Sequence, residues 1–298
     1  MTLDLDTFLV ALYTLVDDLY REKVMPLLPK RPGPPGLLAD SELLTLALLC
    51  HWGVWKSERA FLRWAHAHLM PYFPSLGSQS RFNRRVRHLW CILGMLYRQS
   101  AQTLASPSPY RVMDPTPIPV CKVVRWRKSP FRGKAAKSWC AAKKEWYFGF
   151  KLFLAVTPEG VITSAALLPA NVGDRPGAEE ILCQEQHPCY LADKGFCSPD
   201  WEREWLGTYN VNVLTPPYRN HKRAWPEEYC RRMSGLRQMV EVVAAALKGT
   251  FRLEQHGAKT DTGLWARIAA KLAAYSLAQC INKAYHRPLM AFATLCSW

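Results

Sequence analysis

The chain has 298 residues, 49% of them hydrophobic, which predicts a packed core in one large domain or two ordinary ones. Its 39 Lys and Arg residues exceed its 24 Asp and Glu residues by 15, which favours an acidic partner such as nucleic acid. The longest apolar run, Leu43 to Cys50, is far shorter than the roughly 20 residues of a membrane span, and the ten cysteines show no paired spacing. These features argue against a membrane protein and a disulfide scaffold, and they predict reduced thiols in a cytoplasmic protein.

The first hundred residues carry apolar residues at helical spacing. Asp6 is the expected cap of a first helix, which Pro26 and Pro29 are expected to end. The remaining predicted features are a loop at Lys30 to Gly36 and helices that begin near Asp40, at Arg59 and at Ser78 or Ser80.

The last of these helices has two contrasting faces. Its expected buried stripe holds Phe82, Val86, Leu89, Leu93 and Leu96. Its opposite face is basic, which suits the backbone or a groove of DNA but is equally typical of a solvated charged face. Residues 1–105 are therefore interpreted as a helical DNA-binding domain. Its candidate DNA ligands are Arg81, Arg84 and Arg85, with His88 on the same face.

After the loop at residues 106–109, the pattern changes to short runs of β-forming residues. Tyr147 to Val156 and Val161 to Leu168 predict a hairpin with a turn at Thr157 to Gly160. The whole succession predicts the order β, β, β, α, β, α, β, α, a mixed sheet with flanking helices in one α/β domain over residues 106–298. The remaining expected elements are strands at 110–114, 189–193 and 211–215 and helices at 177–184, 199–205, 236–248 and 264–285.

Three acidic residues stand out in this second domain. Asp114 is expected to end the first strand, and Asp193 is expected to end the fourth. Glu241 lies on a predicted helix whose Arg237 and Lys248 share its face, while the other face of that helix is apolar. Acids at strand ends and on one helix are expected to meet in a shared site.

Each of these residues also has a simpler interpretation. Asp114 and Asp193 are typical turn residues. Arg237 and Glu241, four positions apart, are typical of a surface ion pair worth about 0.2–0.5 kcal/mol. The order of the acids and their basic surroundings together favour the shared site.

Three carboxylates within several Å repel one another unless one is protonated or a cation lies between them. Carboxylate and water oxygens suit Mg²⁺ or Mn²⁺, and two such ions about 4 Å apart activate water and stabilise the leaving oxygen of a phosphodiester. We therefore expect Asp114, Asp193 and Glu241 to hold two divalent ions. Arg237 and Lys248 are expected to hold phosphates.

Several stretches give the sequence a recognisable resemblance. They are Met113 to Cys121, Tyr147 to Leu152 with Pro169 to Asp174, Ala192 to Phe196, and the helix with Arg237, Glu241 and Lys248. The chain resembles DDE-type bacterial insertion-sequence transposases, in particular the insertion-sequence family numbered nine-eighty-two. Related transposases often carry Tyr three positions before the Arg, where this chain has Ser234.

The resemblance implies a ribonuclease H-like catalytic domain and a transposase that nicks DNA and joins the freed 3′-hydroxyl to another phosphate. Asp114, Asp193 and Glu241 would be its catalytic acids. The implied partners are the terminal inverted repeats of the element and the target DNA, bound by a homodimer. Two alternatives stay open: a transposase-derived DNA-binding protein that no longer cuts, and a metal-dependent nuclease that does not join. The intact acids favour an enzyme, because such acids otherwise only repel DNA.

The strongest basic stretch runs from Lys122 to Lys151, with ten basic residues against the single acid Glu145. A solvated loop is the simple interpretation, but so one-sided a run repels itself unless a polyanion neutralises it. Interleaved aromatic residues suit stacking on bases or sugars. The candidate DNA ligands here are Lys122, Arg125, Arg127, Lys128, Lys143 and Lys144, and the aromatic residues are Trp126, Phe131, Trp139 and Trp146.

Overall fold

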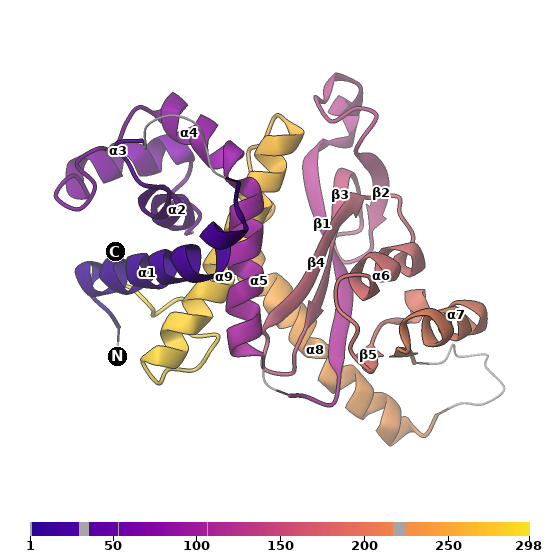
Figure 1. Ribbon diagram of the computed structural model, residues 1–298. Coiled ribbons are helices and arrows are strands. Elements are labelled where there is room, and N and C mark those ends of the chain that lie inside the picture. Colours follow the sequence, from indigo (N-terminus) through magenta and orange to yellow (C-terminus); the bar gives the residue numbers. More distant parts are fainter. Residues whose placement is uncertain (1, 30–35, 53, 106, 217–224) are drawn as a thin grey trace. The chain divides into compact units, whose positions relative to one another are not determined.

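A computed structural model describes residues 2–29, 36–52, 54–105, 107–216 and 225–298. The chain forms two compact units, one of residues 1–104 with 247–298 and the other of residues 105–246. The first unit is helical, and the second is a curled mixed sheet with helices, so the predicted α/β class with a helical N-terminal region is confirmed (Figure 1). No helix among the described residues is long and apolar enough to cross a membrane.

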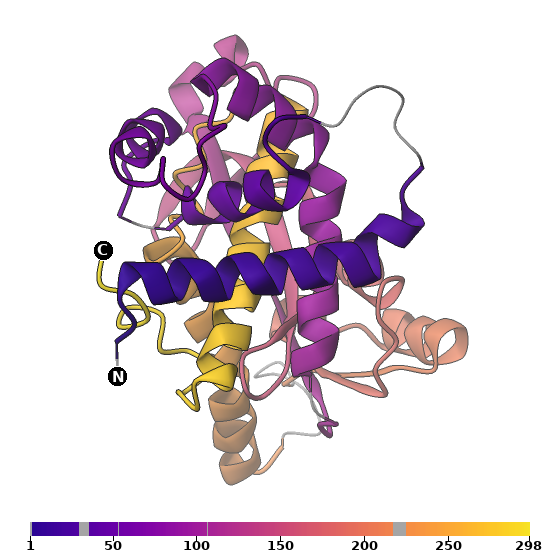
Figure 2. The same cartoon turned by 60° about the vertical axis from the view of Figure 1, so that its left-hand side comes forward.

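The helical unit is built around α5 (Trp90–Leu104) and α9 (Asp261–Ala284), which pack along each other. α1 (Leu5–Leu19) crosses both of them (Figure 2). Ala270, Ala273 and Ala274 of α9 are fully buried, and such small side chains let neighbouring helices approach closely. The other helices of this unit are α2 (Asp40–Leu49), α3 (Glu58–His68) and α4 (Gln79–His88).

The predicted cap of the first helix is wrong. Asp4 takes that place, because its carboxylate accepts a hydrogen bond from the backbone N–H of Thr7 at 2.8 Å. Asp6 lies instead in the first turn, where its negative charge suits the positive end of the helix dipole.

The helical stretch that begins with α1 ends at Leu27, between the two prolines, Pro26 and Pro29, that were predicted to stop it. The chain continues from α1 through a π-helical turn (Tyr20–Val24) into a 3₁₀ turn (Met25–Leu27). Pro26 is at the start of that 3₁₀ turn, where a helix needs no N–H donor. The loop predicted at Lys30 to Gly36 lies outside the described residues except for Gly36.

The predicted fourth helix is two helices. α4 ends at His88 and α5 begins at Trp90, with the buried Leu89 between them. The predicted stripe from Phe82 to Leu96 is nevertheless buried at all five positions, because both helices turn their apolar residues to the same core. The apolar stripe continues from α4 into α5, so its pattern alone does not show that the helix is interrupted at Leu89.

The predicted C-terminal helix is confirmed as α9, but its packing partners differ from the expectation. The sequence grouped it with residues 106–298, whereas it packs with the N-terminal helices in one compact unit. Leu272, Leu277 and Ile281 are all buried, so the helix needs neighbours on several sides, and α1, α2 and α5 provide them. The domain boundary near residue 105 stays a prediction.

The second unit contains one six-stranded sheet. β3 (Glu145–Val156) is its long central strand, pairing antiparallel with β1 on one edge and with β2 and β4 end to end on the other. β5 and β6 extend the sheet in parallel beyond β1, so the predicted mixed sheet and the predicted hairpin are confirmed. The other elements are β1 (Arg111–Lys122), β2 (Ala136–Cys140), β4 (Ile162–Pro169), β5 (Cys189–Leu191), β6 (Asn212–Leu214), α6 (Asp174–Leu182), α7 (Pro199–Tyr209) and α8 (Glu227–Gly249).

The first strand does not end at Asp114, as the sequence predicted, but continues for eight more residues. Pro115, Pro117 and Pro119 alternate along it, so their missing N–H groups all face one edge. β5 pairs with that edge only at Arg111 and Val112, and therefore the prolines cost no hydrogen bond of the ladder.

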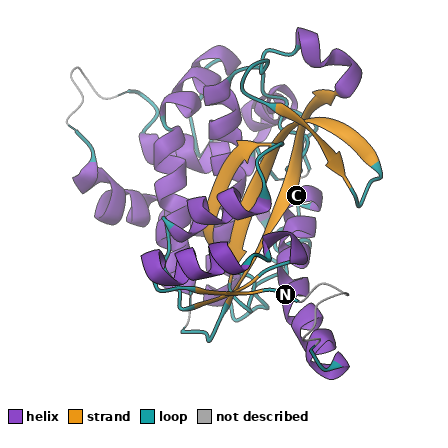
Figure 3. Cartoon of the chain, turned by 90° about the vertical axis from the view of Figure 1, so that its right-hand side faces the viewer, coloured by secondary structure: helices purple, strands orange, loops and turns teal. Residues whose placement is uncertain are grey.

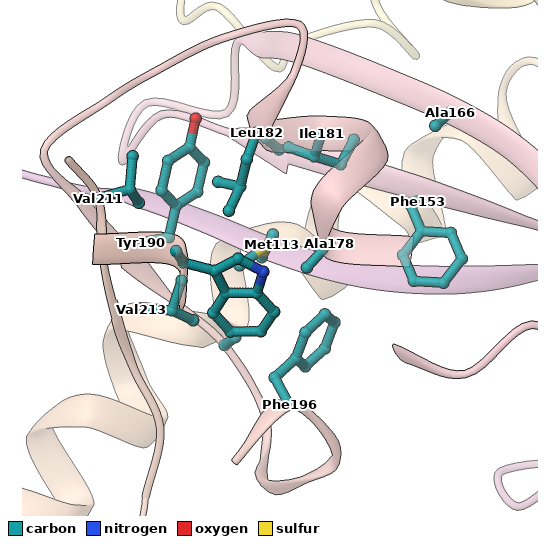
Figure 4. Packing of buried hydrophobic residues seen from close by; sticks show 13 residues of the cluster. Met113, Phe153, Ala166, Ala178, Ile181, Leu182, Tyr190, Phe196, Val211 and Val213 are labelled. Carbon is teal, nitrogen blue, oxygen red and sulfur yellow. The ribbon is translucent and has the colours of Figure 1, made fainter. Parts of the chain in front are cut away.

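A buried cluster fixes α6 and α7 to one face of the sheet (Figure 4). Met113, Phe153 and Tyr190 contribute to it from three strands, and Trp205 contributes from α7. Gly177 of α6 is required for this contact, because a Cβ atom there would lie 2.1 Å from the Phe153 ring. The strands themselves are twisted and curled (Figure 3).

Candidate active site

Asp114 lies in the middle of the sheet, on β1 beside the buried Met113. Side chains alternate along a strand, so Asp114 points away from the cluster that Met113 joins with α6 and α7. Burial raises the pKa of Asp114 to about 7. The site therefore holds a carboxyl group whose ionised form is costly.

Four charged residues surround Asp114 closely enough to change its pKa. Arg237 lowers the pKa, since a nearby positive charge favours the carboxylate. Asp193, Asp174 and Glu241 each raise it by repulsion. The structure thus brings the three predicted acids into one electrostatic neighbourhood and adds a fourth acid, Asp174.

Asp193 is held by the turn that follows β5. It stands at the N-terminal end of a 3₁₀ turn (Lys194–Phe196), as expected for an acid after a strand end, and its side chain is 52% exposed. Its carboxylate lies 3.2 Å from the guanidinium of Arg237 on α8. This ion pair joins two elements, so it differs from the surface pair within one helix that Arg237 and Glu241 suggested.

α8 presents its charged and apolar residues on different sides. Val240, Val243 and Leu247 of the predicted stripe are buried, whereas Leu236 and Met239 are only half-buried and Glu241 is exposed. Lys248, near the helix end, lies 3.6 Å from Glu254. A phosphate ligand role for Lys248 therefore has to compete with this acid.

The role of Asp174 was missed by sequence reasoning. It is the first residue of α6, its carboxylate lies 3.0 Å from the ammonium of Lys151, and it abuts Gly195 beside Asp193. A Cβ atom at Gly195 would be 2.4 Å from an Asp174 oxygen. Two signals were available: Asp174 ends one of the stretches that carry the family resemblance, and it is an Asp at a strand-to-helix junction, which is typical of helix starts in general.

The side chains of this site are of the type that binds a divalent cation, but they are not arranged around a common point. Carboxylate oxygens are the ligands that Mg²⁺ and Mn²⁺ prefer, and repulsion among the acids already raises the pKa of Asp114. However, no group of three or more His, Cys, Asp or Glu side chains in the described part of the chain is arranged to hold a metal ion. Arg237 is the cation that lies beside Asp193.

The predicted DNA ligands of the basic stretch are exposed. They lie in a 3₁₀ segment after β1 (Val123–Lys128), at the end of β1, and in the turn between β2 and β3. Trp139 and Trp146 face each other across that hairpin, 49% and 60% exposed, and remain available for stacking. Phe131 is only 1% exposed, so the expectation that it stacks on DNA is wrong. The exposed basic residues are Lys122, Arg125, Arg127, Lys128, Lys143 and Lys144.

The basic face of α4 is only partly available. Arg81 and Arg84 are exposed, as a DNA-binding face requires. Arg85 donates hydrogen bonds to the carboxylate of Asp40 at 2.9 Å and to the Leu38 carbonyl at 2.8 Å. Arg85 therefore ties α4 to α2 within the helical unit.

The comparison with protein families identifies the chain. The family model of the transposase DDE domain matches residues 106–277, more than half of the sequence. The protein therefore belongs to the DDE-type transposases, which generally use divalent metal ions. Searches against curated proteins and against solved structures gave no match.

Proposed function

We propose that the protein is an active DNA transposase that cuts the ends of an insertion sequence and joins them to target DNA. The observation that carries this proposal is the surroundings of Asp114, a half-buried carboxyl group beside three acids and one arginine, with its pKa raised to about 7 by burial. Repulsion within such a cluster destabilises the folded protein, and clusters of this kind are found where they bind a cation or a substrate. A purely DNA-binding protein gains nothing from acids placed there.

The strand arrangement supports a ribonuclease H-like fold. β1, β3 and β4 form an antiparallel group, and β5 and β6 add to it in parallel after the helices α6 and α7. This succession puts Asp114 on the strand next to β5, so that Asp193 follows an adjacent strand.

Asp114, Asp193 and Glu241 would hold one or two Mg²⁺ or Mn²⁺ ions. A bound divalent ion supplies Lewis acidity, which lowers the pKa of a water molecule and neutralises charge on a phosphate. Asp114 is fixed by a strand paired on its β3 side, so it gives the site a rigid carboxylate. Arg237 orients the more exposed Asp193 and adds a positive charge that suits a phosphodiester.

DNA binding is proposed for two exposed basic surfaces, each within its own unit. In the sheet unit, these are the segment after β1 and the β2–β3 turn. In the helical unit, Arg81 and Arg84 of α4 are exposed, whereas Arg85 is neutralised by Asp40. Contacts of this kind fix the backbone of DNA and are independent of its sequence.

The resemblance to the insertion-sequence family numbered nine-eighty-two adds the expected partners. We propose that the protein acts in the cytoplasm on the terminal inverted repeats of its element and on target DNA. Because two ends are joined in one event, a homodimer on DNA is proposed. Sedimentation with and without end DNA tests this, and a strictly monomeric protein in both would contradict it.

The decisive experiment incubates the purified protein with Mg²⁺ and labelled DNA from the flanks of its own gene. The expected products are nicks that free a 3′-hydroxyl, followed by joined strands. Nicks without joined strands would support the nuclease alternative. Binding without nicks, equal to that of an Asp193→Asn variant, would support the silent DNA-binding alternative.

A further inference from the structure

The helical unit contains a second polar site, which none of the three acids lines. It is a pocket of about 240 Å³ between the start of α3, the segment before it, the loop after α8, and α9. Every residue that lines it belongs to the helical unit and to the described part of the chain. Its basic lining residues are Lys56, Arg59, Arg252, Arg267 and Lys271.

Only one acid, Glu58, is among the residues that line this pocket, all of which are described. Its carboxylate accepts hydrogen bonds from Asn83 at 2.8 and 3.0 Å and lies 3.6 Å from Arg267. Glu58 is therefore already engaged, and five basic residues face one acid. The pocket carries an uncompensated positive charge.

Two of the five basic residues, Lys271 and Arg252, are oriented by neutral partners, which hold them without cancelling their charge. The ammonium of Lys271 donates to the Phe251 carbonyl at 2.6 Å, and the residue is only 3% exposed. Arg252 donates to the Trp55 carbonyl at 2.9 Å and to the Gln255 side chain at 2.8 Å. Arg252 also has a φ of +50°, a conformation that costs energy for a residue with a side chain.

The charge of Lys271 is poorly compensated by its surroundings. Burial, with the positive charges of Arg252 and Arg267 acting in the same direction, lowers the pKa of Lys271 to about 7. The neighbouring Cys50 offers no negative charge, because burial raises the pKa of its thiol to about 12. A bound anion would relieve this electrostatic cost.

Two further features of the pocket suit an anion with several oxygens. Ser57, Glu58 and Arg59 place the N-terminal end of the eleven-residue α3 at the pocket, and that end of a helix attracts negative charge. Trp55 also lines the pocket, and its buried indole N–H has no hydrogen-bond partner among the described residues. A phosphate oxygen is an acceptor of the required kind.

We propose that this pocket binds a phosphate group, whose oxygen acceptors and negative charge match the pocket. The phosphate can come from either of two sources. The first source is the backbone of DNA, and this assignment rests on the proposed function. The second is a free phosphate or a nucleotide, which does not. In both cases the basic residues at the pocket mouth admit the anion, and Lys271 and Arg252 hold it.

The first test measures inorganic phosphate binding to the full-length protein, by thermal unfolding and tryptophan fluorescence against sodium chloride of the same ionic strength. The pocket variant is Lys56→Gln with Arg59→Gln, which changes two exposed side chains and spares the fold. The matched control is Arg63→Gln with Lys259→Gln, two exposed residues of the same unit outside the pocket lining. Lys271→Met tests the interior separately.

Phosphate is expected to raise the unfolding midpoint of the wild type and of the control more than chloride does. The pocket variant should need about tenfold more phosphate for the same rise, as expected for the loss of about 1.4 kcal/mol of binding. If phosphate and chloride act alike on the wild type, or the pocket variant matches the control, the proposal is overturned. A folded Lys271→Met protein that binds phosphate as well as the wild type would also overturn the role of the interior.

The second test separates the two sources by the salt dependence of duplex DNA binding. If the phosphate belongs to DNA, the slope of log affinity against log salt falls by about one unit more in the pocket variant than in the control. Equal slopes, with phosphate binding retained in the first test, assign the pocket to a free phosphate or a nucleotide. A wild type that binds phosphate but no DNA would refute the proposed function and leave the pocket intact.

Discussion

The guanidinium of Arg237 lies 3.2 Å from the carboxylate of Asp193 and at the same time lowers the pKa of Asp114. One arginine of α8 therefore interacts with two acids, one on β1 and one in the turn after β5. Arg237 thus lies beside Asp193, which the sequence analysis predicted to be a metal ligand. Arg237 is only 15% exposed, so its interactions with these acids are weakly screened by water.

Replacing Arg237 with Gln is expected to raise the pKa of Asp114 above about 7 in the metal-free protein, because its favourable positive neighbour is lost. The pH dependence of the unfolding free energy in the presence of a chelator measures this shift. The upper end of the pH-sensitive range should move to higher pH. Arg203→Gln, which removes an exposed arginine of α7, is the control and should leave the range unchanged.

Replacing Asp114 with Asn is expected to stabilise the metal-free protein at pH 8. The pKa of Asp114 is raised from 3.8 to about 7 in the folded state, so the folded protein binds more protons than the unfolded chain between these values. The stability that the protonated group contributes is therefore lost as the pH rises to about 7. At about 1.4 kcal/mol per pKa unit, the cost above pH 7 is on the order of several kcal/mol.

Urea unfolding at pH 5 and pH 8 measures this effect in wild type and Asp114→Asn. The difference between the unfolding free energies at pH 5 and pH 8 should be smaller in the variant than in the wild type. Asp200→Asn, at an exposed position of α7, is the matched control. If this difference in unfolding free energy were equal in wild type and Asp114→Asn, the raised pKa of Asp114 in the folded protein would be refuted.

Much of this site was predictable from sequence because its acids interrupt apolar patterns. Asp114 and Asp193 each follow β-forming runs, and Glu241 is opposite an apolar helix face. These are local signals. The partner of Arg237 was not predictable, because the choice between Asp193 and Glu241 depends on where α8 crosses the sheet unit.

Asp174 and the length of β1 show why other features were missed. Asp174 enters the site through contacts with Lys151 and Gly195, each about 20 positions away, and no local pattern encodes them. The prolines of β1 predict a strand end, since proline lacks an N–H donor. They are tolerated because the edge they face is unpaired beyond Val112, which is a property of the sheet and not of the strand.

Asp114→Asn, Asp193→Asn and Glu241→Gln are each expected to abolish DNA cleavage and to leave DNA binding equal or tighter. Each change removes a proposed metal ligand and a negative charge near phosphate. Mg²⁺ and Mn²⁺ should support cleavage, whereas Ca²⁺, which accepts looser geometry, should support binding with little cleavage. Cleavage and gel-shift assays on the same DNA test both parts, and cleavage by Asp193→Asn would sink the assignment.

Gly195→Ala is expected to destabilise the protein by about 0.5–1.5 kcal/mol, the usual net contribution of one hydrogen bond, because the atom that must move is the end of a side chain. Its Cβ atom would displace the Asp174 carboxylate, which then loses its contact with Lys151. The control is Gly207→Ala in α7, where a Cβ atom meets nothing within 4 Å. That change should be neutral or stabilising, because alanine favours a helix.

A double-mutant cycle with Asp174→Ala separates this clash from a general effect at Gly195. Removing the Asp174 carboxylate makes room for the new methyl group, so the double variant should be more stable than the sum of the single changes predicts. Simple additivity in urea unfolding would show that Asp174 and Gly195 do not meet.

Neutralising Arg125, Arg127 and Lys128 together is expected to weaken DNA binding for all sequences. The three side chains are exposed on the short 3₁₀ segment after β1. Exposed positive charges of this kind suit the phosphate backbone, which has the same charge whatever the base sequence. Each lost phosphate contact should lower the slope of log affinity against log salt by about one unit.

The control for this triple change should lose the same charge elsewhere. Lys23, Arg63 and Lys259 are exposed on the helical unit, so their replacement by Gln lowers the net charge of the whole protein equally. A general electrostatic effect would reduce the affinity of both triple variants alike. A direct contact of the segment with DNA instead predicts a reduced slope of log affinity against log salt in the Arg125, Arg127 and Lys128 variant alone. If that variant and the wild type have the same affinity and the same slope, the segment does not touch DNA.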